Sequence, residues 1–132
     1  MSRRVVITGS AAITPIGNTR EGILRHLTEG LSVTTVGEDV TVGHGVILHG
    51  CTVGDRALIG MGSILLDLSE VGAGSVLGAG SLLTPRSVIP PGHLAHGRPA
   101  RTVRPVNDFE AQMGYAGACH YVASSRRYLA GG

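Results

Sequence analysis

Branched aliphatic residues recur through the middle of the chain at a nearly constant spacing. Every step is six residues, except the step from Leu48 to Val53, which is five. The positions are Val36, Val42, Leu48, Val53, Ile59, Leu65, Val71, Leu77, Leu83 and Ile89. A repeat this short is typical of a β-helix, in which each unit stacks on the next and buries its apolar side chain.

Two further patterns follow the aliphatic repeat. Counting four positions on from each of the first nine aliphatics gives small or β-branched residues, namely Val40, Val46, Thr52, Ala57, Ser63, Ser69, Ser75, Ser81 and Ser87. Glycine directly follows the aliphatic in two units of every three, at 37, 43, 54, 60, 72 and 78. Glycine suits corners because it tolerates positive φ and close backbone approach. The double period predicts a three-sided prism with coils over about 36–52, 53–70 and 71–88.

The two flanks have different patterns. Residues 1–32 predict a strand at Val5–Ile7, a glycine turn, and a helix that begins near Thr19 and ends near Gly30. The C-terminal segment predicts a helix over Asp108–Leu129. Its expected buried stripe is Phe109, Met113, Tyr121 and Leu129, and its interior glycines at 114 and 117 lower the helix propensity.

The predicted fold class is therefore mainly β: a left-handed parallel β-helix with a C-terminal α-helix and an N-terminal strand-turn-helix cap. The expected parts are a capping segment over 1–32, the β-helix over 33–104 and the C-terminal helix over 105–132. A prism this short leaves unpaired strand edges at its ends, and exposed edges favour association unless they are covered. We expect capping, oligomerisation or both.

Composition excludes several classes of protein. The chain has 132 residues, 21 of them glycine, and aromatic residues make up 3%. Its net charge of +2 comes with 11 basic residues, all arginine and spread along the chain, so no nucleic-acid partner is expected. The longest apolar runs are too short to span a membrane, so no membrane partner is expected. Cys51 and Cys119 form no disulfide framework, which favours the cytoplasm.

Two of the six histidines lie within the repeats. His44 and His49 both fall at corners and are expected to point outward from different sides of the prism. One subunit could not chelate an ion with both, whereas two packed subunits could bring His49 of one chain to His44 of the next. The residues alone also fit two ordinary surface histidines at turns, and spacing by itself does not separate these interpretations.

The string "TVGEDVTVGHGVILHGCTVGDRALIGMGSILLD", with "GAGSVLGAGSLLTPRSVIPPG" and "GRPARTVRPV" after it, resembles the γ-class carbonic anhydrase-like family over about 34–130. This resemblance implies a homotrimer with zinc, or iron or cobalt in its place, bound by three histidines between subunits. His44 and His49 match two of these ligands. It also implies reversible hydration of carbon dioxide to bicarbonate, because a bound zinc lowers the pKa of water toward about 7.

The third ligand of the family has no evident counterpart. Counting back 17 or 18 residues from His49 gives Ser32 or Leu31, neither of which binds zinc well. His26 lies 18 residues before His44, in a different column of the prism and within the expected helix. A catalytic zinc generally has three protein ligands and an open position. We therefore expect impaired activity, assign no catalytic residue, and leave open whether the chain is an enzyme.

Residues 3–32, "RRVVITGSAAITPIGNTREGILRHLTEG", show a second resemblance, to the N-terminus of β-ketoacyl synthases. This resemblance implies a chain joined from fragments of two families, naturally or by engineering. Residues 3–32 are far too few for synthase activity. We expect them to cap the prism.

The remaining candidates have structural interpretations. Cys51 is expected to pack near the next coil and Cys119 to pack within the helix, while His93, His96 and His120 have no partners at ligand spacing. Corner aspartates satisfy local backbone donors more often than they act as paired catalytic groups; here these are Asp39, Asp55 and Asp67.

The sequence is therefore compatible with three hypotheses. The first is a zinc-dependent γ-carbonic anhydrase-like enzyme. The second is a non-catalytic trimeric β-helix module. The third is a hexapeptide-repeat acyltransferase, since one fold can carry several activities; against it, the chain has no lysine to bind the phosphates of coenzyme A.

Overall fold

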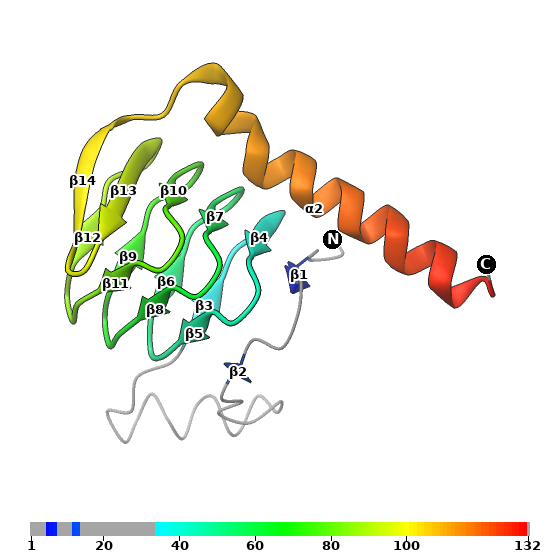
Figure 1. Cartoon of the computed structure of the whole chain (residues 1–132), viewed down its shortest axis with the longest axis horizontal. Helices are drawn as coiled ribbons and strands as arrows, with labels where there is room; N and C mark the ends of the chain where they lie inside the picture. Colours follow the sequence, from blue (N-terminus) through cyan, green and yellow to red (C-terminus); the bar gives the residue numbers. More distant parts are fainter. Residues whose placement is uncertain (1–4, 8–11, 14–33, 132) are drawn as a thin grey trace.

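The computed structural model describes residues 5–7, 12–13 and 34–131. Within these ranges, short parallel strands wind into a three-sided prism, and a long helix follows at the C-terminal end (Figure 1). The predicted mainly β fold is confirmed: a parallel β-helix of stacked coils with a C-terminal α-helix.

Three sheets form the sides of the prism among the described residues. Sheet A contains β1 (Val5–Ile7), β4 (Val40–Val42), β7 (Leu58–Ile59), β10 (Val76–Leu77), β13 (His93–Gly97) and β14 (Ala100–Pro105). Sheet B contains β2 (Ala12–Ile13), β5 (Ile47–Leu48), β8 (Ile64–Leu65) and β11 (Leu82–Leu83). Sheet C contains β3 (Thr35–Val36), β6 (Thr52–Val53), β9 (Glu70–Val71) and β12 (Val88–Ile89).

The aliphatic repeat forms the core, as predicted. Nine of the ten repeat positions are at most 2% exposed, namely Val42, Leu48, Val53, Ile59, Leu65, Val71, Leu77, Leu83 and Ile89, while Val36 is partly buried. Burying one such side chain contributes about 1.5–3 kcal/mol, so these columns supply most of the driving force for the prism. Ser63, Ser69, Ser75 and Ser81 are fully buried beside them, and each hydroxyl donates to a backbone carbonyl.

The buried column of small residues departs from a regular count at one position. Cys51, at 0% exposed, occupies the inner column, whereas Thr52 is exposed. The cause is the five-residue step: only His49 and Gly50 separate Leu48 from Cys51, while three residues separate Leu65 from Ser69 in the next coil. The corner before Cys51 is therefore one residue shorter than the equivalent corner of the next coil. For this reason the residue four positions after Leu48 is Thr52, one position beyond the buried column.

The glycines that follow the aliphatics are required by close approach between rungs. A Cβ at Gly43 would lie 2.7 Å from the backbone nitrogen of Met61, a distance that side chains do not tolerate. Positive φ occurs at a later corner residue, which is glycine at Gly45 and Gly62 but is Arg56 at another corner. The two properties attributed to corner glycines therefore belong to different positions of each corner.

The strand predicted at Val5–Ile7 is present, and it is part of the prism. β1 pairs in parallel with β4, placing Ile7 opposite Val42, and β2 pairs with β5, placing Ile13 opposite Leu48. Strand β2 was not evident from the sequence pattern. The glycine turn and the helix predicted after this strand fall largely in residues 8–11 and 14–33, outside the described residues. Ile7 and Ile13 thus extend two sides of the prism by one further rung.

Helix α2 (Asp108–Leu129) packs against sheet A, beside β10, β4 and β1 (Figure 1). A capping box starts it, because the Asn107 side chain accepts from the Glu110 backbone N–H and the Glu110 carboxylate accepts from the Asn107 N–H. None of the helices described in the structure is long and apolar enough to cross a membrane.

The predicted buried stripe of this helix was wrong. Phe109 is 76% exposed and Leu129 is 88% exposed, whereas the buried positions are Gly114 and Ala118. A Cβ at 117 would lie 2.8 Å from the Thr41 Oγ1, and one at 114 would overlap the Arg56 carbonyl oxygen. Small residues therefore let the helix backbone approach the sheet, and the large side chains lie on either side of this contact.

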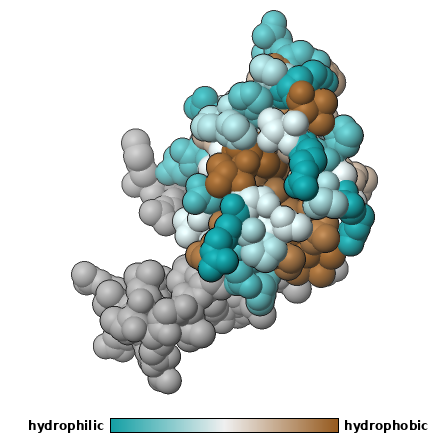
Figure 2. All heavy atoms as spheres, turned by 90° about the vertical axis from the view of Figure 1, so that its left-hand side faces the viewer, coloured by the Kyte–Doolittle hydropathy of each residue, from teal (hydrophilic) through white to brown (hydrophobic). Residues whose placement is uncertain are grey.

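Seen from the end that carries β13 and β14, the surface mixes hydrophilic side chains with hydrophobic ones in several separate places (Figure 2). β14 is the last strand of sheet A, and its pairing with β13 is interrupted by a shift in register after Leu94. Arg101 and Arg104 lie on this strand. Bulges and charged residues are common ways of protecting an edge strand from further pairing.

Candidate functional site

His44 lies at the corner between sheets A and B. It directly follows Gly43, after the end of β4, and its side chain is exposed. Its backbone carbonyl accepts a 2.8 Å hydrogen bond from the Gly62 N–H of the next rung. The pairing of β4 with β7 places Met61 in the equivalent corner position, so the two side chains belong to neighbouring rungs. The imidazole is thus held on a fixed backbone and faces outward.

His49 lies at the next corner, between sheets B and C. Its backbone N–H donates to the Leu65 carbonyl over 2.9 Å, which fixes this shortened corner to the rung above. The His49 Nε2 lies 3.4 Å from an Asp67 carboxylate oxygen, with the two side chains 58% and 43% exposed. A carboxylate that holds one ring nitrogen of a histidine leaves the other nitrogen oriented and free to bind.

The two histidines lie at opposite ends of β5, and the prism separates them. Both were expected to point outward from different corners, and the topology agrees, because His44 follows sheet A and His49 follows sheet B. Within the described residues there is no group of three His, Cys, Asp or Glu side chains placed to hold a metal ion. Asp67 lies 3.4 Å from His49, a contact that was not expected from the sequence.

A groove adjoins His44 between α2 and the outer side of sheet A. Its volume is about 360 Å³, and it is lined on the strands by Leu58, Val76 and Met61 and on the helix by Met113 and Tyr121. The groove was not evident from the sequence pattern. Tyr121 and Met113 are regularly spaced on α2, but only the packing of the helix through its small residues shows that they border a space.

Cys51 is a free thiol packed in the core of the prism. Burial raises its pKa from 9.0 to about 11, so the protonated form prevails at neutral pH. This agrees with the expectation that Cys51 packs against the neighbouring coil. Cys119, expected to pack within the helix, is instead exposed.

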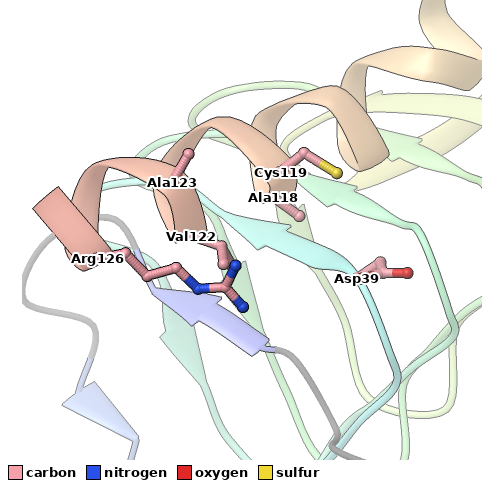
Figure 3. Close-up of a pocket in the computed structure, with 6 residues that line it drawn as sticks. All are labelled: Asp39, Ala118, Cys119, Val122, Ala123 and Arg126. Carbon is pink, nitrogen blue, oxygen red and sulfur yellow. The ribbon is translucent and has the colours of Figure 1, made fainter.

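Cys119 borders a hollow of about 170 Å³ between α2 and the strands, together with Asp39 and Arg126 (Figure 3). Arg126 extends its guanidinium from the helix toward the strands (Figure 3). At a nearby corner, Asp55 Oδ1 accepts a 2.8 Å hydrogen bond from the Glu38 N–H, as expected of a corner aspartate. His93 contacts the Pro91 carbonyl through Nδ1 at 2.9 Å, a local contact within its own turn.

No family model matches the chain. It is 42% identical to Protein YrdA of Escherichia coli strain K12 over 135 aligned positions, covering 95% of this chain and 73% of that protein. It is 44% identical to a carbonic anhydrase of Geobacillus kaustophilus, covering 78% of this chain and 58% of that protein. A solved hexapeptide transferase family protein from Anaplasma phagocytophilum superposes with a TM-score of 0.70 at 44% identity, over 72% of this chain and 57% of that one.

These comparisons bear on both resemblances. Because the first match covers 95% of the chain, it extends over most of residues 3–32. The comparisons do not support a β-ketoacyl synthase fragment there, and the described strands β1 and β2 belong to the prism. The hexapeptide-repeat matches agree with a left-handed β-helix. The chain belongs to the family of γ-carbonic anhydrase-like hexapeptide-repeat proteins.

Proposed function

We propose that this protein is a γ-carbonic anhydrase-like, metal-dependent enzyme that hydrates carbon dioxide to bicarbonate at sites shared between subunits of a homotrimer. The observation that carries the proposal is the placement of His44 and His49 as exposed imidazoles at opposite ends of one strand, β5. One prism can therefore offer one ligand to each of two neighbours. The similarity to a named carbonic anhydrase supports the chemistry.

Sheet B supports the proposed trimer. Its outer side carries an apolar ladder in which Ile47 is paired with Ile64 and Ile64 with Leu82. Ile47 is 44% exposed, and Leu68 at the adjoining corner is 54% exposed. A heterologous contact that closes into a ring uses two different patches of each subunit. The ladder lies between the corners of His44 and His49, so packing along it would bring one corner of each subunit to a neighbour.

The donor set suits zinc, with iron or cobalt as alternatives. Imidazole nitrogens are ordinary ligands of all three ions. Within one subunit, the described residues do not supply a closed ligand shell, so the fit requires a neighbouring chain. A zinc ion held there would supply the Lewis acidity that hydration of carbon dioxide needs at neutral pH. His44 and His49 would bind it, and water or a further group would complete the shell.

Asp67 would act through His49. Its carboxylate lies 3.4 Å from Nε2 of the imidazole, close enough to orient the ring and to favour a proton on the nitrogen that faces Asp67. The opposite nitrogen then keeps its lone pair for the ion. Asp67 is thus a positioning residue in this proposal.

The free thiols of Cys51 and Cys119 fit a reducing compartment, and we place the protein in the cytoplasm on that ground.

The test is metal analysis of the purified full chain, followed by carbon dioxide hydration assays on wild type and His49→Ala. We expect zinc to co-purify with wild type and to be lost, together with the hydration rate, from His49→Ala. His93→Ala is the matched control, because the His93 imidazole contacts the Pro91 carbonyl in its own turn and lies outside the proposed site. A His26→Ala variant asks whether a third imidazole comes from outside the described residues. Absence of metal with equal rates in all variants would remove the proposal.

Two alternatives have support of their own. The first is a non-catalytic trimeric module that assembles through the apolar ladder. A trimer that contains no metal and does not accelerate the hydration of carbon dioxide would favour it. A hexapeptide-repeat acyltransferase is favoured by the superposition on a hexapeptide transferase family protein. Calorimetric titration with acetyl-coenzyme A distinguishes it, since no heat of binding would exclude that substrate.

A further inference from the structure

The groove beside His44 has the dimensions of a small-molecule site. Its volume is about 360 Å³, and ligand pockets in proteins usually enclose about 300–1,000 Å³. Its floor is the outer side of sheet A, formed by Leu58 and Val76, and α2 closes one side with Met113 and Tyr121. The space extends well beyond what a triatomic molecule such as carbon dioxide would fill.

The lining of the groove selects against charged ligands. None of the residues that line it is an aspartate, a glutamate, an arginine or a lysine. An ion entering such a site would lose hydration without gaining a charged partner, a cost of several kcal/mol. The neighbouring corner pocket is different, because Glu38, Asp39, Asp55 and Arg56 line it. The groove beside His44 therefore fits an uncharged ligand.

Three of the lining side chains favour an aromatic ring. Met61 and Met113 are 58% and 39% exposed, so their thioethers are available to a ligand. A sulfur–aromatic contact contributes about 0.3–1.5 kcal/mol. Tyr121, also 39% exposed, offers a ring for an edge-to-face or offset pair, worth about 0.5–1.5 kcal/mol beyond the buried area. His44 also lines the groove, and its imidazole can donate a hydrogen bond from a ring N–H.

We propose that this groove binds a small uncharged aromatic carbonyl compound, with its ring against Met61, Met113 and Tyr121 and its carbonyl oxygen at His44. The proposal goes beyond carbon dioxide as a ligand. It rests on the proposed function only in that His44 takes part in both sites. No bond is made or broken in it.

The test uses three probes of nearly the same shape and different charge: benzamide, benzoate and benzamidinium. The metal-free full chain, labelled with [methyl-13C]methionine, is titrated and followed by NMR. The chain has three methionines, so Met61→Leu and Met113→Leu assign the groove signals and Met1 serves as the internal reference. We expect benzamide to move the Met61 and Met113 signals to saturation, with the two ions binding at least about tenfold more weakly. Equal binding of the three probes would overturn the proposal.

Two matched variants locate the site. Ala79 and Ala73 are both exposed and each stands between two glycines, but Ala79 lines this groove and Ala73 lines the acidic corner. Ala79→Phe should fill the groove and weaken benzamide binding at least about tenfold, while Ala73→Phe should leave it unchanged. Unweakened binding in a folded Ala79→Phe would contradict the assignment.

Other outcomes are equally decisive. The Met61 and Met113 chemical shifts could instead stay constant with all three probes and change only when the protein is diluted to monomers. That result would show that a second copy occupies the groove, and it would exclude the ligand site. The charge series needs no variant, so it holds even if Ala79→Phe does not fold. Zinc content is measured on separate samples, so loss of the proposed metal site and loss of benzamide binding are told apart.

Discussion

The hydroxyl of Thr41 donates a 2.7 Å hydrogen bond to the backbone carbonyl of Gly114 and so ties α2 to sheet A. Thr41 lies on the outer side of β4, three residues before His44. This bond fixes the helix that forms one wall of the groove. It exists because the helix presents small residues at the contact, where a larger side chain would hold the two backbones apart.

Thr41→Val should lower the free energy of unfolding by about 0.5–1.5 kcal/mol, because it removes the donor and keeps the shape. Thr52→Val is the control: Thr52 is an exposed strand residue, and the expected change is within about 0.5 kcal/mol. Urea unfolding followed by circular dichroism measures both. Equal stability of the two variants would show that the bond does not anchor the helix.

Acid should loosen the start of α2. The hydrogen bond from Arg104 holds the pKa of Glu110 at about 2, against 4.5 normally, and the Asn107 N–H lowers it further in the same direction. Since the pKa is depressed on folding, the stabilisation is complete above about 4.5 and is lost as pH falls toward 2. Unfolding curves at pH 7, 4 and 2 should therefore show wild type and Glu110→Gln converging at the lowest pH. A constant difference across these values would contradict this linkage.

The two cysteines should differ sharply in reactivity. Cys51 is buried and burial raises the pKa of its thiol to about 11, whereas Cys119 is exposed. Because the thiolate is the reacting form, iodoacetamide at pH 8 should label Cys119 in the folded protein and Cys51 only after denaturation. Intact mass spectrometry counts the labels. Labelling of a folded Cys119→Ala protein would show that Cys51 is accessible.

Asp67→Asn should weaken zinc binding by about 10–100-fold while leaving the fold intact, because the His49 imidazole loses the carboxylate that orients it. Asp55→Asn is the control, since Asp55 contacts the Glu38 backbone at another corner. Competition with a zinc-binding dye measures the affinities. Equal affinity of Asp67→Asn and wild type would show that this carboxylate does not position the ligand.

Much of the prism was predictable, because its core residues recur in the sequence at a nearly constant spacing. Ile7 and Ile13 repeat the six-residue step toward the N-terminus, but residues 14–35 separate them from Val36, so the sequence pattern did not link them to the prism. The packing of α2 was not predictable from apolar periodicity, since Gly114 and Ala118 make the contact. Among site residues, the corner positions of His44 and His49 followed from the repeat. The pairing of His49 with Asp67 and the groove depend on contacts between rungs.

The most direct test of the shared metal site is subunit complementation. His44→Ala and His49→Ala chains are purified separately, freed of metal, mixed in equal amounts, reassembled and assayed for zinc. Each variant alone should bind none. If each site takes His44 from one subunit and His49 from the next, random mixing should restore about a quarter of the wild-type zinc per chain. A mixture that binds no more zinc than either variant alone would contradict a site built between subunits.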